Sequence, residues 1–217
     1  MYRSGRHTSD PWGFAVVLLA IGSFMMLDMT AYAEPRVGQP APDFAATGID
    51  GQRVKLSALR GKTVVLEWTN DQCPYVMKHY GSGNMQALQR EATGDGVVWI
   101  SIISSAKGSE GNVSPAEAAE LTKSRNAAPS NIVLDESGMI GRLYDARTTP
   151  HMFVINPQGN VVYMGGIDDK PSTRQSDIAG ANNYVRAALK AVKTGQPVAT
   201  PIARPYGCSV KYKPQNS

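Results

Sequence analysis

Cysteine is scarce in this sequence, and its scarcity limits the sulfur chemistry that the chain can perform. The chain has 217 residues and two cysteines, Cys73 and Cys208. Cys73 lies in the segment NDQCPYVMKHY, and Val76 stands at the position where many thiol enzymes carry a second cysteine. A mixed disulfide at Cys73 therefore has no local partner to resolve it, and Cys208 is the only other thiol.

Acidic residues are absent after Asp177, and the chain as a whole is mildly basic, with a net charge of +4 and a pI near 9.1. Aromatic residues make up 7% of the chain, and the basic residues do not cluster densely with them. Nucleic-acid binding requires such clustering and stacking aromatics, so we do not expect a nucleic-acid partner. The charge excess indicates a solvated surface instead.

A hydrophobic run long enough to span a bilayer comfortably is also lacking, because the apolar segment Ala15–Leu27 is too short. Arginines precede this segment, and small residues at Ala31–Ala33 follow it. This pattern predicts a signal peptide over residues 1–33 and a mature chain that begins at Glu34, periplasmic or secreted and without membrane insertion. An uncleaved membrane anchor is the alternative.

Hydrophobic patterning in the rest of the chain predicts an α/β domain over 34–195, followed by a tail over 196–217 that carries Cys208. The predicted strands are 63–68, 96–104 and 131–136, followed by a hairpin over 151–166. Helical patterns cover 74–80, 82–92, 114–127, 137–146 and 180–195. Alternating strands and helices predict a parallel sheet, and the hairpin adds antiparallel strands. We therefore expect a central mixed β-sheet with helices on both faces.

Several short motifs together resemble the thioredoxin-like superfamily. They are GQPAPDF at 38–44, RGK at 60–62, the Cys73 segment, TTP at 148–150 and FVINPQGNVVYMGG at 153–166. Within that superfamily the chain is most similar to the redoxins of the alkyl hydroperoxide reductase/thiol-specific antioxidant (AhpC/TSA) group. The resemblance extends from about residue 37 to residue 193 and implies a thioredoxin-like fold.

The resemblance assigns Cys73 to the position of the nucleophilic cysteine and implies that Thr149 and Pro150 form the loop that faces it, with Pro150 in the cis form. Such a loop pairs with an extended thiol or disulfide substrate much as an edge strand does. The chain departs from the peroxiredoxin pattern P-x-x-x-T-x-x-C, because Leu66 and Asn70 occupy the proline and threonine positions. It therefore resembles peroxiredoxins in scaffold but not in the peroxide-binding pattern.

The residues around Cys73 favour an ionised thiol. Pro74 suits the first position of a helix, with the aromatic Tyr75 after it, and the helix N-terminus stabilises a thiolate at Cys73. Lys78 and His79 lie one to two turns along, where they either add positive charge near the sulfur or form an exposed helix face. Near the Thr149–Pro150 loop, Arg147 and His151 either face the thiolate or are solvated.

The leading hypothesis is an exported thiol-disulfide oxidoreductase in which Cys73 attacks and Cys208, on a tail flexible enough to reach back over the domain, resolves. Its partners are protein or small-molecule thiols and disulfides and a periplasmic reductant, with no cofactor. A thiol peroxidase acting on peroxide is the first alternative. The others are a permanent 73–208 staple in a scaffold that binds a partner, and a metal-handling module with Cys73, His79 and His151 as ligands. Asp168 and Asp169, which follow the hairpin, are interpreted as turn or cap residues.

Overall fold

The structure, a computed structural model, describes residue 1 and residues 34–214; the predicted signal peptide therefore lies outside the described residues apart from Met1. The strands are β1 Ala45–Thr47, β2 Arg53–Lys55, β3 Val64–Trp68, β4 Val98–Ile103, β5 Asn131–Leu134, β6 Thr148–Thr149, β7 His151–Ile155, β8 Val161–Gly165 and β9 Cys208–Ser209. The α-helices are α1 Pro74–Gly81, α2 Asn84–Gly94, α3 Pro115–Ser124, α4 Met139–Leu143 and α5 Tyr184–Lys193. Two 3-10 helices, η1 Leu56–Leu59 and η2 Gln175–Gly180, complete the set. No helix among the described residues is long and apolar enough to cross a membrane.

The five-stranded central sheet has the order β5-β4-β3-β7-β8. The pairs β3·β4 and β4·β5 are parallel, whereas β7 runs antiparallel to both β3 and β8. The predicted mixed sheet and its closing hairpin are therefore confirmed. All five residues of β3 are buried because this strand lies at the centre of the sheet, which explains its continuous apolar run.

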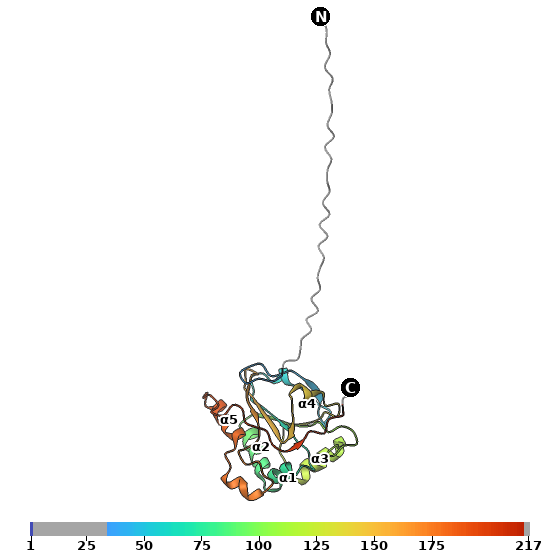
Figure 1. Ribbon diagram of the computed structural model, residues 1–217, viewed down its shortest axis with the longest axis vertical. Helices are drawn as coiled ribbons and strands as arrows, with labels where there is room; N and C mark the ends of the chain where they lie inside the picture. Colours follow the sequence, from blue (N-terminus) through green and yellow to red (C-terminus); the bar gives the residue numbers. More distant parts are fainter. Residues whose placement is uncertain (2–33, 215–217) are drawn as a thin grey trace. The chain divides into compact units, whose positions relative to one another are not determined.

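Helices cover both faces of the sheet, as predicted (Figure 1). Leu66 and Trp68 of β3 point to the face that α4 covers, where they pack with Tyr144 and Phe153. The opposite face carries α1, α2 and α5. Its buried residues are Val65, Cys73, Val76, Tyr80, Met85, Leu88, Ala92, Trp99, Met152, Val154, Tyr163, Ile167, Val185 and Ala188. Cys73, just before α1, thus belongs to this hydrophobic core.

One buried acid, Glu67 of β3, organises the polar contacts within this second core. Its side chain accepts hydrogen bonds from Tyr80 (2.9 Å), Gln89 (3.2 Å), Trp99 (2.7 Å) and Ser101 (2.9 Å). Burial raises the pKa of Glu67, while these hydrogen bonds oppose the rise. The carboxyl group therefore connects α1, α2 and β4 to the central strand through fully satisfied buried donors.

Replacing Glu67 tests this role. We expect Glu67→Leu to lower the free energy of unfolding by several kcal/mol, because each buried donor left without an acceptor costs about 1–3 kcal/mol. Glu67→Gln keeps a carbonyl oxygen for part of the network and should lose less than half as much. Urea unfolding of both variants measures the difference; equal losses would contradict the assignment.

The raised pKa of Glu67 also predicts a pH dependence. Its folded-state pKa lies above its unfolded value, so the folded state binds more protons and stability falls as pH rises through the raised pKa. Glu67→Gln cannot ionise and should lack this decline. Urea midpoints across the acidic range compare the two proteins, and parallel profiles would rule out a titrating Glu67.

Candidate active site

Cys73 lies where the central strand β3 gives way to α1, and a buried asparagine sets this turn. The side-chain oxygen of Asn70 accepts from the backbone N–H of Gln72 (2.9 Å), and its amide donates to the carbonyl of Glu110 (3.1 Å). The backbone carbonyl of Asn70 accepts from the N–H of Cys73 (3.2 Å). Asn70, which occupies the threonine position of the peroxiredoxin pattern, is therefore a turn-forming residue here.

Cys73 is the N-cap residue of α1, and Pro74 begins the helix, as the sequence predicted. The carbonyl of Cys73 accepts from the N–H of Met77 (2.8 Å), which leaves the sulfur at the first turn. The side chain is 0% exposed. The sulfur is thus placed at a helix N-terminus, where a thiolate is favoured, yet it is covered in the structure.

What covers it is the C-terminal segment 200–213, which we call the strap. Its strand β9 pairs antiparallel with β6, so that Cys208 lies opposite Thr149 and Ser209 opposite Thr148. The tail reaches back over the domain, as expected, and is docked there through strand pairing. Backbone hydrogen bonds fix it along its length, from Ala203 to Met164 (3.1 Å), from Val210 to Arg147 (3.1 Å) and from Ala106 to Lys211 (2.8 Å).

Close packing against the Thr149 loop requires a glycine in the strap. The Thr149–Pro150 peptide bond is cis, in agreement with the expectation from the resemblance. Gly207 has a φ of +143°, and a Cβ atom there would lie 2.0 Å from the Thr149 carbonyl oxygen. Only glycine at this position lets the following Cys208 approach Cys73.

The two thiols are free, and each shifts the pKa of the other. Burial by itself raises the pKa of the Cys73 thiol. Hydrogen-bonding groups around the sulfur lower it by a larger amount, so the net pKa lies below the ordinary value of a cysteine. The polar groups around the sulfur that lower its pKa belong to Cys208, Thr149 and Val76. The neutral thiol, in turn, donates to the Thr149 carbonyl (3.0 Å).

Cys208 has the opposite bias. Partial burial, together with the hydrogen bond and charge of Cys73, raises the pKa of Cys208 to about 12. Its side chain is partly exposed, whereas Cys73 is fully buried. The two thiols therefore differ in acidity and in exposure. Cys73 favours the thiolate, whereas Cys208 retains its proton and lies closer to the surface.

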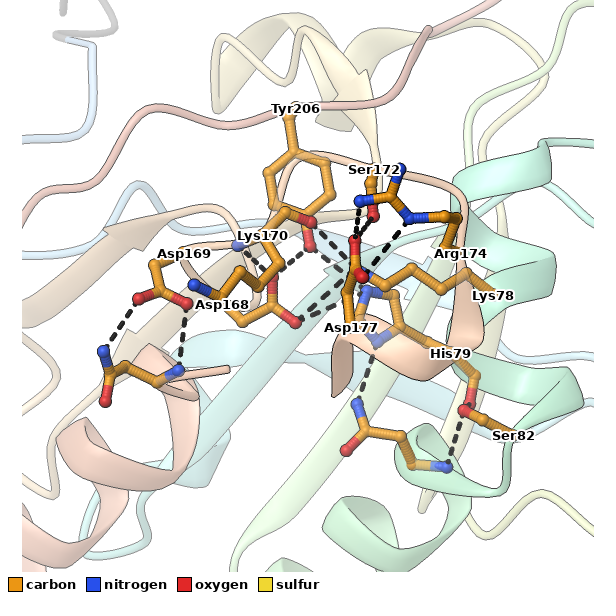
Figure 2. Close-up of polar contacts among 12 residues, drawn as sticks. Lys78, His79, Ser82, Asp168, Asp169, Lys170, Ser172, Arg174, Asp177 and Tyr206 are labelled. Carbon is orange, nitrogen blue, oxygen red and sulfur yellow. Dashed lines mark hydrogen bonds and ion pairs between the residues drawn. The ribbon is translucent and has the colours of Figure 1, made fainter. Parts of the chain in front are cut away.

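Lys78 and His79 differ from both alternatives that the sequence left open, because neither is exposed and neither contacts the Cys73 sulfur. Both are buried in a polar cluster with Asp168 and Tyr206 (Figure 2). Lys78 Nζ donates to the backbone carbonyl of Lys170 (2.8 Å) and lies 3.9 Å from Asp168 Oδ2. Burial lowers the pKa of His79 to about 4, so its ring is neutral at neutral pH.

Tyr206 brings the strap into this cluster. Its hydroxyl donates to Asp168 Oδ1 and lies 3.2 Å from His79 Nε2. The ring packs edge-on against Tyr75, the second residue of α1, with centroids 5.9 Å apart. Asp168 keeps the predicted turn role by accepting from the N–H of Lys170 (2.9 Å), but it is only 3% exposed. No local sequence pattern predicts this burial, because Tyr206, which contacts Asp168, is distant along the chain.

The other two predicted residues, Arg147 and His151, make no hydrogen bond to the Cys73 sulfur within the described part of the chain. Arg147 pairs with Asp145, and its side chain is 70% exposed, so the solvated alternative holds. His151 is buried beside Phe153, and its Nδ1 accepts from the Arg147 N–H (3.3 Å). Burial lowers the pKa of His151 to about 4.

The structure does not assemble the metal-handling site. Within residues 34–214, no group of three or more histidine, cysteine, aspartate or glutamate side chains could hold a metal ion. Both ring nitrogens of His79 are engaged, Nδ1 with Asn84 (2.8 Å) and Nε2 with Tyr206. The described residues therefore give no support to copper binding by Cys73, His79 and His151.

Known proteins share both sequence and fold with this chain. The thiol-disulfide oxidoreductase ResA of Bacillus subtilis (strain 168) is 29% identical over 132 residues, which are 58% of this chain and 64% of ResA. An uncharacterized conserved protein from Geobacillus kaustophilus is 27% identical with a TM-score of 0.70, over 83% of this chain and 94% of that one. A putative thiol:disulfide interchange protein DsbE from Chlorobium tepidum shares the fold, at 24% identity and a TM-score of 0.53, over 72% of this chain and 99% of its own.

The chain spans less than two thirds of the length of ResA, so the match covers only part of that relative. The family model described as the AhpC/TSA family matches residues 37–164, from the segment before β1 into β8. This range contains Cys73 and the Thr149–Pro150 loop but ends before the strap. Because the model matches more than half of the sequence, and because the fold is thioredoxin-like, the chain belongs to the AhpC/TSA family.

Proposed function

We propose that this protein is an exported thiol-disulfide oxidoreductase that uses Cys73 as its nucleophile and Cys208 as its resolving thiol. One observation carries the proposal: β9 pairs with β6 and places Cys208 opposite Thr149, whose carbonyl accepts from the Cys73 thiol (3.0 Å) at the N-terminus of α1. The relatives named for thiol-disulfide chemistry support the reaction class. Export rests on the predicted signal peptide over residues 1–33.

The oxidative half of the reaction converts the thiol pair to a disulfide. The Cys73 thiolate attacks one sulfur of a substrate disulfide, forms a mixed disulfide and releases the other substrate sulfur as a thiolate, which takes up a proton. Cys208 then loses its proton and attacks the Cys73 sulfur. The second substrate thiolate leaves, and the 73–208 disulfide remains. The substrate gains two electrons and two protons, and the protein loses them.

The reductive half restores the pair, with a periplasmic thiol as reductant. Its thiolate attacks the Cys208 sulfur, which is partly exposed, and Cys73 leaves as the thiolate. The lower pKa of Cys73 supports this direction, because a thiol of lower pKa is the better leaving group. A second reductant thiolate then releases Cys208. In this scheme Cys73 reacts with the substrate disulfide, and the more exposed Cys208 reacts with the reductant.

A permanent staple explains less of the structure than a working pair does. The strap is already held by backbone and side-chain hydrogen bonds on both sides of Cys208, so a disulfide is not needed to fix it. The opposed pKa shifts of the two thiols suit exchange, since they provide a nucleophile and a protonated partner. A reduction potential well below about −300 mV would instead mark a staple.

The cysteine variants test the assigned roles. We expect Cys73→Ser to abolish reduction of insulin disulfides in the presence of dithiothreitol. Prereduced Cys208→Ser, freed of dithiothreitol, should still attack insulin and accumulate a mixed disulfide with the insulin chain at Cys73, visible by mass spectrometry. Activity retained in Cys73→Ser would refute the nucleophile assignment. Rapid turnover of hydrogen peroxide by the wild type would favour the peroxidase alternative.

The hydrogen bond from Cys208 predicts a measurable effect on the acidity of Cys73. We expect the pKa of Cys73 to rise in Cys208→Ala, because the thiolate loses a donor. Cys208→Ser retains a hydroxyl donor and should show a smaller rise. Ultraviolet absorbance of the thiolate against pH reports each value, with Cys73→Ala as the blank. An unchanged pKa in Cys208→Ala would contradict the predicted contact.

Sulfite identifies the sulfur that an incoming reductant attacks. It cleaves a disulfide into an S-sulfonate on the attacked cysteine and a thiolate on the other. We expect the oxidised wild-type protein to carry the S-sulfonate on Cys208 and to release Cys73. Acid quenching, alkylation in denaturant and peptide mass spectrometry locate both groups. An S-sulfonate mainly on Cys73 would reverse the assignment.

A further inference from the structure

The strap closes the site that the proposed reaction must open. Cys73 is 0% exposed, and the carbonyl of Thr149, where an extended substrate would pair, lies against Gly207 of the strap. The pairing positions of Thr148 and Thr149 are occupied by Ser209 and Cys208. The chain's own C-terminal segment therefore holds the place of a substrate.

Tyr206 is the strap side chain that reaches the buried polar cluster beside α1. It precedes Cys208 by two residues, and its ring packs on Tyr75, which follows Cys73 by two residues. Its hydroxyl reaches into the buried cluster and contacts Asp168 and His79 (Figure 2). The position of the Cys208 thiol is thus coupled to the hydrogen bond between the Tyr206 hydroxyl and Asp168.

The chemistry of the cluster suits an anchor that can be released. Lys78 and Asp168 are both buried, with side chains 0% and 1% exposed, and Lys78 Nζ lies 5.6 Å from the centre of the Tyr206 ring. Burying a charged pair costs desolvation free energy that its attraction only partly recovers. Lifting the strap lets water reach these groups, which offsets the loss of the phenol hydrogen bond. An apolar side chain in place of Tyr206 would only lose free energy when exposed to water on opening.

We propose that Tyr206 is a positioning residue that latches the strap to the cluster of Lys78, His79 and Asp168, and that this latch must open before an extended substrate can replace the strap on Thr149. The inference rests on the proposed function and adds a gate to it. Closed, the latch holds Cys208 ready to resolve. Open, it exposes Cys73 and the β6 edge to a cysteine-containing segment of another protein.

The variant Tyr206→Phe removes the hydroxyl and keeps the ring on Tyr75. In a Cys208→Ser background, where Cys73 is the only thiol, we expect iodoacetamide to alkylate Cys73 about tenfold faster, because the open fraction rises when a hydrogen bond to a carboxylate is lost. Tyr144→Phe is the matched control. It removes a buried phenol hydroxyl whose partner, the Pro42 carbonyl (2.7 Å), lies outside the strap. Its alkylation rate should equal that of the parent.

A second readout separates gating from a general loss of stability. With both cysteines present, Tyr206→Phe should lower the apparent KM for insulin several-fold, because the strap competes less with substrate, without a matching rise in kcat. Tyr144→Phe should leave KM unchanged. Unchanged alkylation and KM in Tyr206→Phe, or equal changes in both variants, would overturn the latch. If the wild type proves inactive on insulin, the proposed function fails, and the alkylation rates alone decide the latch.

Discussion

The pairing of two residues of β9 with two residues of β6 is the interaction on which the rest of the site depends. It sets Cys208 opposite Thr149, and so brings together thiols that are 135 positions apart in the chain, 208 − 73. A CxxC motif achieves the same proximity within one helical turn. Here the second thiol arrives on a separate strand, and its distance from Cys73 varies with the docking of that strand.

In this arrangement one segment both carries the second cysteine and occupies the β6 edge, whereas in a CxxC motif the second cysteine leaves that edge free. In the proposed reaction Cys208 lies on the segment that occupies the β6 edge, so the strap could not resolve a mixed disulfide and admit a new substrate at the same time. The proposal therefore implies an order in which the strap leaves, the substrate enters, and the strap returns with Cys208.

Most of the fold could be predicted from the sequence because its signals are local. The β-branched runs of β3, β4 and β5, the turn of the β7–β8 hairpin and the proline after Cys73 each mark one element. The burial of Lys78, His79 and Asp168 could not, since on an isolated α1 or turn these side chains would face water. Part of their environment comes from Tyr206, more than 30 positions beyond Asp168, and no periodic pattern in the sequence predicts that contact.

The same separation explains why the family resemblance reaches the nucleophile but not its partner. Cys73 and the Thr149–Pro150 loop lie inside the range that the AhpC/TSA model matches, whereas the strap lies beyond it. The scaffold supplies a helix N-terminus that favours a thiolate and an open strand edge beside it. What is added here is a segment that fills that edge with the chain's own cysteine. An exposed edge next to a reactive thiol would pair with any extended peptide. Under the proposed gating, a strand that must be displaced would restrict access to partners that bind the edge more tightly than the strap does.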